Sequence, residues 1–127
     1  MRQADLFRDA ITADAVLAAL RDSVGSTHGR TARSLVLALV GKASPAAERR
    51  LREVIYALRL AGHPVCGVPT EGYYLAATAA ELDRTCEFLY GRSMTSLRQV
   101  SAMKRVTLPD LRGQLGLALE KQHESDE

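Results

Sequence analysis

The chain has 127 residues, of which 46% are hydrophobic and 25% are charged, and its net charge is +2. This is the composition of a single globular domain with one modest core. The sequence has no apolar run of the roughly 20 residues that span a bilayer, no signal-peptide pattern and only two cysteines. We therefore expect no membrane partner, no secreted disulfide framework and a location in the cytoplasm of a bacterium or of a cell infected by a virus.

The charge is unevenly distributed along the chain. Lys and Arg outnumber Asp and Glu in residues 21–68 and again in 84–105, whereas the last 18 residues are mainly acidic. A basic body with an acidic end is compatible with binding to a polyanion. An ordinary solvated surface would give a similar count.

Two short helices are predicted in the first forty residues. Thr12 can cap a helix over "ADAVLAALRDS", and "RTARSLVLALVG" predicts a second, largely buried helix that ends at Gly41. The glycines and hydroxyl residues of "VGSTHG" separate them. The apolar face expected for the first helix comprises Ala15, Leu17, Ala18 and Leu20.

The third helix, predicted over 45–61, has the clearest signals at both ends. Ser44 is a strong N-cap, Pro45 suits the first helical position and Gly62 ends the helix. The three- and four-residue spacing of its apolar residues predicts one buried face. That face comprises Ala47, Leu51, Val54, Ile55 and Leu58.

The segment 63–76 predicts a β-hairpin. "HPVCGV" and "YYLA" have strand character, and "PTEG" between them is typical of a turn. We expect Tyr73 and Leu75 to face the core and Tyr74 to face solvent. An isolated hairpin is marginally stable, so it must pack on the helices.

A long helix is predicted over 78–106, beginning with a capping box formed by Thr78 and Glu81. Its apolar seam is long enough to suggest a homodimer, although the helix could instead fold back over its own domain. The seam comprises Leu82, Cys86, Leu89, Tyr90, Met94 and Leu97. Residues 107–127 are read as an acidic, loosely ordered tail.

The order of elements predicts a mainly α fold with a small β-hairpin, namely a winged helix-turn-helix domain over residues 1–77 followed by the long C-terminal helix. In that arrangement the third helix enters the major groove of double-stranded DNA, and the hairpin, or wing, lies along the DNA backbone. The guanidinium of arginine can form bidentate hydrogen bonds with guanine and with phosphate. The wing tip, in contrast, carries Glu71 and no basic residue. The residues expected to contact DNA are Arg49, Arg50, Arg52, Glu53 and Tyr56 on the third helix, together with Arg30 and Arg33, which are expected on phosphates, and Lys42.

The amino-acid sequences of two segments resemble those of a group of small phage and prophage proteins with a winged-helix domain. These segments are "ERRLREVIYALRLAGHPVCGVPTEGYYLA" and "ELDRTCEFLYGRSMTSLRQVSAMKRV", and the resemblance covers residues 12–106. The group consists mostly of predicted DNA-binding or uncharacterised phage proteins, so the resemblance implies a viral DNA-binding protein acting in transcription regulation or replication. The acidic wing tip departs from wings that grip DNA.

Other chemistries are weakly supported by the sequence. His63, Cys66 and Cys86 supply three ligands where a structural zinc site needs four, and no nucleophile motif or phosphate-binding loop is present. We therefore expect no metal, no cofactor and no catalytic residue. The alternative function is a winged-helix protein-interaction module, such as a phage factor that inhibits a host nucleic-acid machine.

Overall fold

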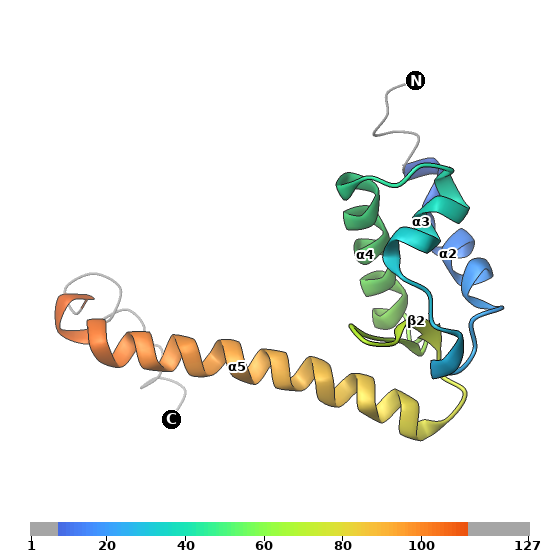
Figure 1. Cartoon of the computed structure of the whole chain (residues 1–127). Coiled ribbons are helices and arrows are strands. Elements are labelled where there is room, and N and C mark those ends of the chain that lie inside the picture. The colour runs from blue at the N-terminus through green and yellow to red at the C-terminus, as the bar shows by residue number, and fades with distance from the viewer. Residues whose placement is uncertain (1–7, 112–127) are drawn as a thin grey trace. The chain divides into compact units, whose positions relative to one another are not determined.

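The computed structural model describes the backbone of residues 8–111 and the side chains of residues 8–105 (Figure 1). Within this range the protein is mainly helical, with one two-stranded antiparallel hairpin and a long C-terminal helix. A short helical stretch at 8–10 precedes the named elements. In chain order these are α2 (Ala13–Leu20), the 3-10 turn η1 (Ser26–His28), α3 (Ala32–Val40), α4 (Pro45–Leu60), β1 (Val65–Val68), β2 (Gly72–Leu75) and α5 (Ala79–Leu111).

The chain divides into two compact units, Met1–Phe88 and Leu89–Glu127. The first unit contains α2 to β2 and the first turns of α5. The second unit contains the remainder of α5, which is one continuous helix through Gly91.

Local signals at the helix ends are used as the sequence predicts. The side chains of Thr12 and Ser44 accept hydrogen bonds from the backbone N–H groups of Ala15 and Ala47, which satisfies donors that the first helical turn leaves free. Gly41 ends α3 with a positive φ of 86°, a conformation that glycine adopts without strain. The predicted capping of α2, α3 and α4 is therefore confirmed.

One hydrophobic core lies between α2, α3, α4 and β1. All five residues of the predicted α4 face are buried in it, because their three- and four-residue spacing places them on one side of the helix. The face predicted for α2 is wrong except at Leu20. Val16 is its second buried residue, and Ile11 reaches the core from just before the helix.

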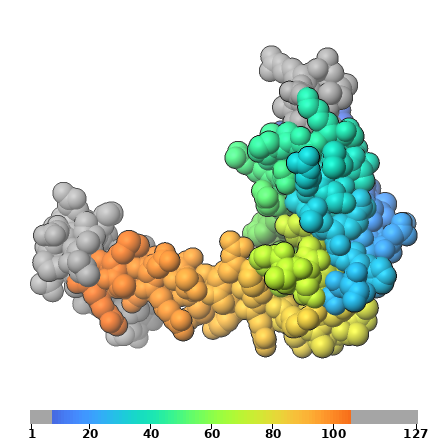
Figure 2. All heavy atoms as spheres, in the orientation of Figure 1, coloured from blue at the N-terminus to red at the C-terminus, as the bar shows by residue number. Residues whose placement is uncertain are grey.

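The hairpin pairs Val65 with Leu75 and Val68 with Gly72, and β2 also bonds to a second segment on its other edge. Tyr73 and Arg30 exchange two backbone hydrogen bonds of 2.8 and 2.9 Å, and Leu75 bonds in the same way to Ser23 and Gly25. In Figure 2 the atoms of the hairpin pack beside those of the segment before α3. The loop between α2 and α3 therefore completes a small sheet around β2.

Two glycines permit this close approach. A side chain at Gly29 would collide with the backbone carbonyl of Glu71, and one at Gly72 would meet the backbone of Arg30 at 2.8 Å. Gly72 also has a positive φ of 74° at the end of the turn.

The predicted solvent exposure of Tyr74 is wrong, whereas the predicted packing of Tyr73 and Leu75 on the core side is confirmed. Tyr74 is fully buried, whereas Tyr73 and Leu75 are half-buried and pack against the edge of the core. Tyr74 is buried because the outer face of the hairpin is also covered. The first turns of α5 lie there, where Cys66, the cross-strand neighbour of Tyr74, contacts the carbonyl of Glu81.

The start of α5 agrees with the sequence and its end does not. Thr78 caps the helix by accepting a hydrogen bond from the N–H of Glu81. The helix then continues to Leu111, past the predicted end at residue 106, so the first residues of the predicted tail are helical. The rest of that tail, 112–127, lies outside the described residues. Over 8–111, none of the helices combines the length and apolar character of a membrane span.

Candidate nucleic-acid interface

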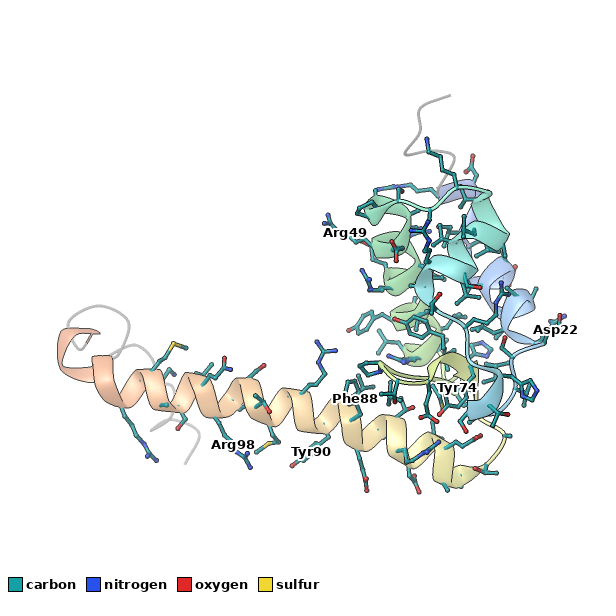
Figure 3. The ribbon with its side chains drawn as sticks, viewed as in Figure 1. Asp22, Arg49, Tyr74, Phe88, Tyr90 and Arg98 are labelled. Carbon is teal, nitrogen blue, oxygen red and sulfur yellow. The ribbon has the colours of Figure 1, made fainter. Side chains whose placement is uncertain are left out.

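The outer face of α4 carries most of the predicted DNA-contacting residues. Arg49, Arg52, Glu53 and Tyr56 are all exposed, and 65% of the surface of Tyr56 is accessible. Figure 3 shows Arg49 projecting from the side of α4. Because the opposite face of the helix is fixed in the core, these side chains are held on a rigid support.

Arg50 lies on the same turn but is anchored within the protein. Its Nε donates a hydrogen bond of 3.2 Å to the backbone carbonyl of Ile11, and its guanidinium lies 3.8 Å from the carboxylate of Glu53. The Arg50 side chain is 34% exposed, so it retains some access to solvent. This arginine ties α4 to the segment before α2, and Glu53 offsets part of its charge.

The three cations predicted to contact DNA from outside the third helix occupy different environments. Arg33 and Lys42 are exposed. Arg30 is half-buried, and its guanidinium donates to the hydroxyl and the carbonyl of Ser34 at 3.2–3.3 Å. Arg33 and Lys42 are thus accessible from solvent, whereas Arg30 is hydrogen-bonded to the first turn of α3.

Charge is segregated along the first unit. Residues 30–59 carry seven Lys and Arg against Glu48 and Glu53, a balance of +5. Residues 71–87 carry four acidic residues against Arg84 alone, a balance of −3. The α3–α4 region is therefore the basic part of this unit, and the hairpin turn with the start of α5 is the acidic part.

The tip of the hairpin offers no free cation. Glu71, in its turn, forms an ion pair of 3.1 Å with Arg84 of α5, and its side chain is 22% exposed. The carboxylate of Glu71 in turn raises the pKa of Arg84. The turn is thus tied to α5 by a paired charge.

Two side chains that were not among the predicted site residues form hydrogen bonds with the outer edge of β1. Arg59 Nε donates a hydrogen bond of 2.8 Å to the carbonyl of Val65, and Thr85 Oγ1 accepts one of 3.2 Å from the N–H of Gly67. Thr85 is buried. No local pattern identifies either role, because both partners are backbone groups brought near by the fold.

The predicted dimerisation residues are largely accessible on α5. Tyr90 is 69% exposed, Leu97 58%, Leu89 38% and Leu82 37%. Cys86 is also exposed, and Met94 is half-buried. Figure 3 shows Tyr90 and Arg98 projecting from α5.

The residues considered for metal binding do not assemble. Across the part of the chain with described side chains, no group of three or more His, Cys, Asp and Glu could hold a metal ion. Cys66 is buried beside Glu81, whereas Cys86 is exposed.

Comparison with protein-family models, with curated proteins and with solved structures found no match to this chain. The function must therefore be argued from its own residues.

Proposed function

We propose that this protein is a winged helix-turn-helix protein that binds double-stranded DNA through the outer face of α4. The observation that carries the proposal is a rigid helix with Arg49 and Arg52 exposed on it, in the basic part of an otherwise mixed-charge unit.

The order of elements supports this fold. In a winged helix, a short strand between the first two helices pairs with a hairpin that follows the third helix. Here the segment 23–30 lies between α2 and α3 and bonds to β2, and the hairpin follows α4 directly. On this view α4 is the recognition helix.

The side chains of α4 have suitable chemistry for a DNA groove. Arg49 and Arg52 can each make a bidentate contact with guanine or phosphate, and Tyr56 can contact a base edge or a phosphate. Arg33 and Lys42 supply further phosphate contacts. The hairpin tip contributes little, because Glu71 is acidic and paired with Arg84.

The proposal is tested by the binding of a fluorescent duplex of mixed sequence, measured by anisotropy across a salt series. With about four phosphates neutralised, the logarithm of the affinity should fall with the logarithm of salt concentration at a slope of about −3 to −4. Replacing Arg49 and Arg52 together by Ala should weaken binding about 10- to 100-fold.

Arg21→Ala provides a matched control. Arg21 is also exposed, and its neighbour Asp22 lies on the side of the first unit away from Arg49 in Figure 3. The proposal fails if the protein binds no duplex at low salt, or if the Arg49 and Arg52 variant binds as tightly as the Arg21 variant.

A second candidate is a protein-interaction module, favoured by the apolar end of the same helix face. Leu60 is 72% exposed, and with Tyr56 it forms an apolar surface next to the arginines. Aromatic and arginine side chains are enriched at protein interfaces. Failure to bind duplex DNA would favour this candidate, with a host or phage protein as the partner.

A further inference from the structure

The exposed residues of α5 form a surface independent of the α4 face. Its apolar positions recur at steps of three or four residues, apart from one step of seven between Tyr90 and Leu97, which places them along one side of the helix. We call this set the α5 seam: Leu82, Cys86, Leu89, Tyr90, Leu97, Val100 and Met103. Such a row of exposed apolar side chains is typical of an interaction site.

Charge on α5 changes sign along its length. Residues 79–88 carry Glu81, Asp83 and Glu87 against Arg84, a balance of −2. Residues 89–105 carry no acidic residue and four cations, namely Arg92, Arg98, Lys104 and Arg105. The helix is therefore acidic at its start and basic further along.

We propose that a second copy of this chain covers the α5 seam, and that the two α5 helices pair in antiparallel orientation with their crossing near Ser93. Antiparallel pairing brings the acidic start of each helix against the basic section of the other. Parallel pairing would align acid with acid and base with base, which is unfavourable. The charge pattern thus selects both the partner and its direction.

The residues on either side of Ser93 match in the proposed pairing. Positions equally distant from the crossing face each other, so Cys86 meets Val100 of the partner subunit and Leu89 meets Leu97 of the partner subunit. At the edge of the seam, Asp83 lies near Lys104 of the partner subunit. The layers formed by Cys86 with Val100 and by Leu89 with Leu97 are apolar, and opposite charges meet at the flank.

The centre of the seam suits a close crossing. Ser93, at the crossing, and Ser96 beside it have small side chains. Small residues at the crossing let two helices approach while the larger residues fill the space on either side. This inference does not depend on DNA binding by α4.

Charge exchange tests the orientation. Sedimentation equilibrium of the full chain at micromolar concentration should give a dimer. Asp83→Lys and Lys104→Glu should each weaken the dimer about tenfold, because each places like charges together at both ends of the seam. The double variant should recover dimer affinity to within a few-fold of the unsubstituted chain. A monomeric chain, or a double variant no tighter than the single variants, would overturn the proposal.

Disulfide trapping tests the register. Cys86 is exposed and Cys66 is buried, so mild oxidation reports on Cys86 alone. Parallel helices would place the two Cys86 residues together and cross-link the unsubstituted chain, which would contradict antiparallel pairing. In the antiparallel pairing, Val100→Cys should create a cross-linked dimer, and adding Cys86→Ser should remove it. Thr95→Cys, on the opposite side of α5, is the matched control and should not cross-link.

Discussion

The carboxylate of Glu81 accepts a hydrogen bond of 2.8 Å from the backbone N–H of Ser26, although the two residues are 55 positions apart. The other oxygen of the same carboxylate accepts one of 2.8 Å from Ala77 N–H. One side chain thus fastens the loop between α2 and α3 to the start of α5. These bonds favour the ionised carboxylate and lower the pKa of Glu81 below its ordinary value of 4.5.

We expect Glu81→Gln to destabilise the fold near neutral pH and to flatten its acid sensitivity. The unfolded chain protonates Glu81 at a higher pH than the native protein does. The stability contributed by the carboxylate is therefore complete above about pH 4.5 and is lost as the pH falls through the lower native pKa. Urea unfolding at several pH values measures both effects. Glu87→Gln, at an exposed site on the same helix, should leave the profile unchanged.

The hydroxyl of Tyr74 is buried and no described residue meets hydrogen-bond geometry with it, although the guanidinium of Arg84, which pairs with Glu71, lies nearby. Removing an unpaired buried hydroxyl costs little, so Tyr74→Phe should keep the free energy of unfolding within about 1 kcal/mol of the unsubstituted protein. A loss well above this value would mean that the hydroxyl has a stabilising partner.

The same variant should change the alkaline limit of stability. Burial raises the pKa of Tyr74 above its ordinary value of 10.0. The unfolded chain therefore loses this proton first, and the free energy of unfolding falls as the pH rises above about 10. Tyr74→Phe should remove this component, whereas Tyr56→Phe, at an exposed site, should retain it.

Two glycines should respond in opposite ways to alanine. Gly29→Ala places a methyl group against the backbone carbonyl of Glu71, which has no freedom to move aside, and should cost about 1–3 kcal/mol. Gly91→Ala adds a methyl group in open space within α5 and should favour the helix by about 0.5–1 kcal/mol. Thermal unfolding of the pair provides an internal comparison.

Neighbouring arginines on α4 should separate stability from binding. Arg50→Met loses the hydrogen bond to the Ile11 carbonyl and should lower the free energy of unfolding by about 1–2 kcal/mol. Arg49→Met should change it by less than about 0.5 kcal/mol, since Arg49 is exposed. Under the proposed function, Arg49→Met should nevertheless reduce duplex affinity more than Arg50→Met does. Equal losses of affinity would argue against Arg49 as a direct contact.

The sequence predicted those elements whose determinants are local. Helix α4 is the clearest example, because Ser44, Pro45 and the spacing of its apolar residues specify its start and its buried face without reference to the rest of the chain. The turn that ends at Gly72 was likewise predicted from the segment "PTEG". The exposed position of Arg49 follows directly from the same periodicity.

The remaining features depend on contacts between distant segments. Tyr74 was predicted to be exposed because its burial requires α5 to cover the outer face of the hairpin, and strand alternation alone does not say whether that face is covered. The loop 23–30 carries no strand pattern, yet it bonds to β2 because Gly29 and Gly72 let the backbones meet. The anchoring of Arg50 requires the Ile11 carbonyl, 39 positions away.

The side chains of Arg59 and Thr85 also affect which surfaces of this protein can bind another chain. They form hydrogen bonds with outward-facing backbone groups of β1, while the loop 23–30 forms backbone hydrogen bonds with the other edge of β2. Unpaired strand edges recruit further strands, both in aggregation and in recognition of extended peptides. Here both edges of the hairpin already have internal partners. The small sheet is therefore protected against edge-to-edge association and is a poor template for an added strand, so recognition is left to the faces of the helices.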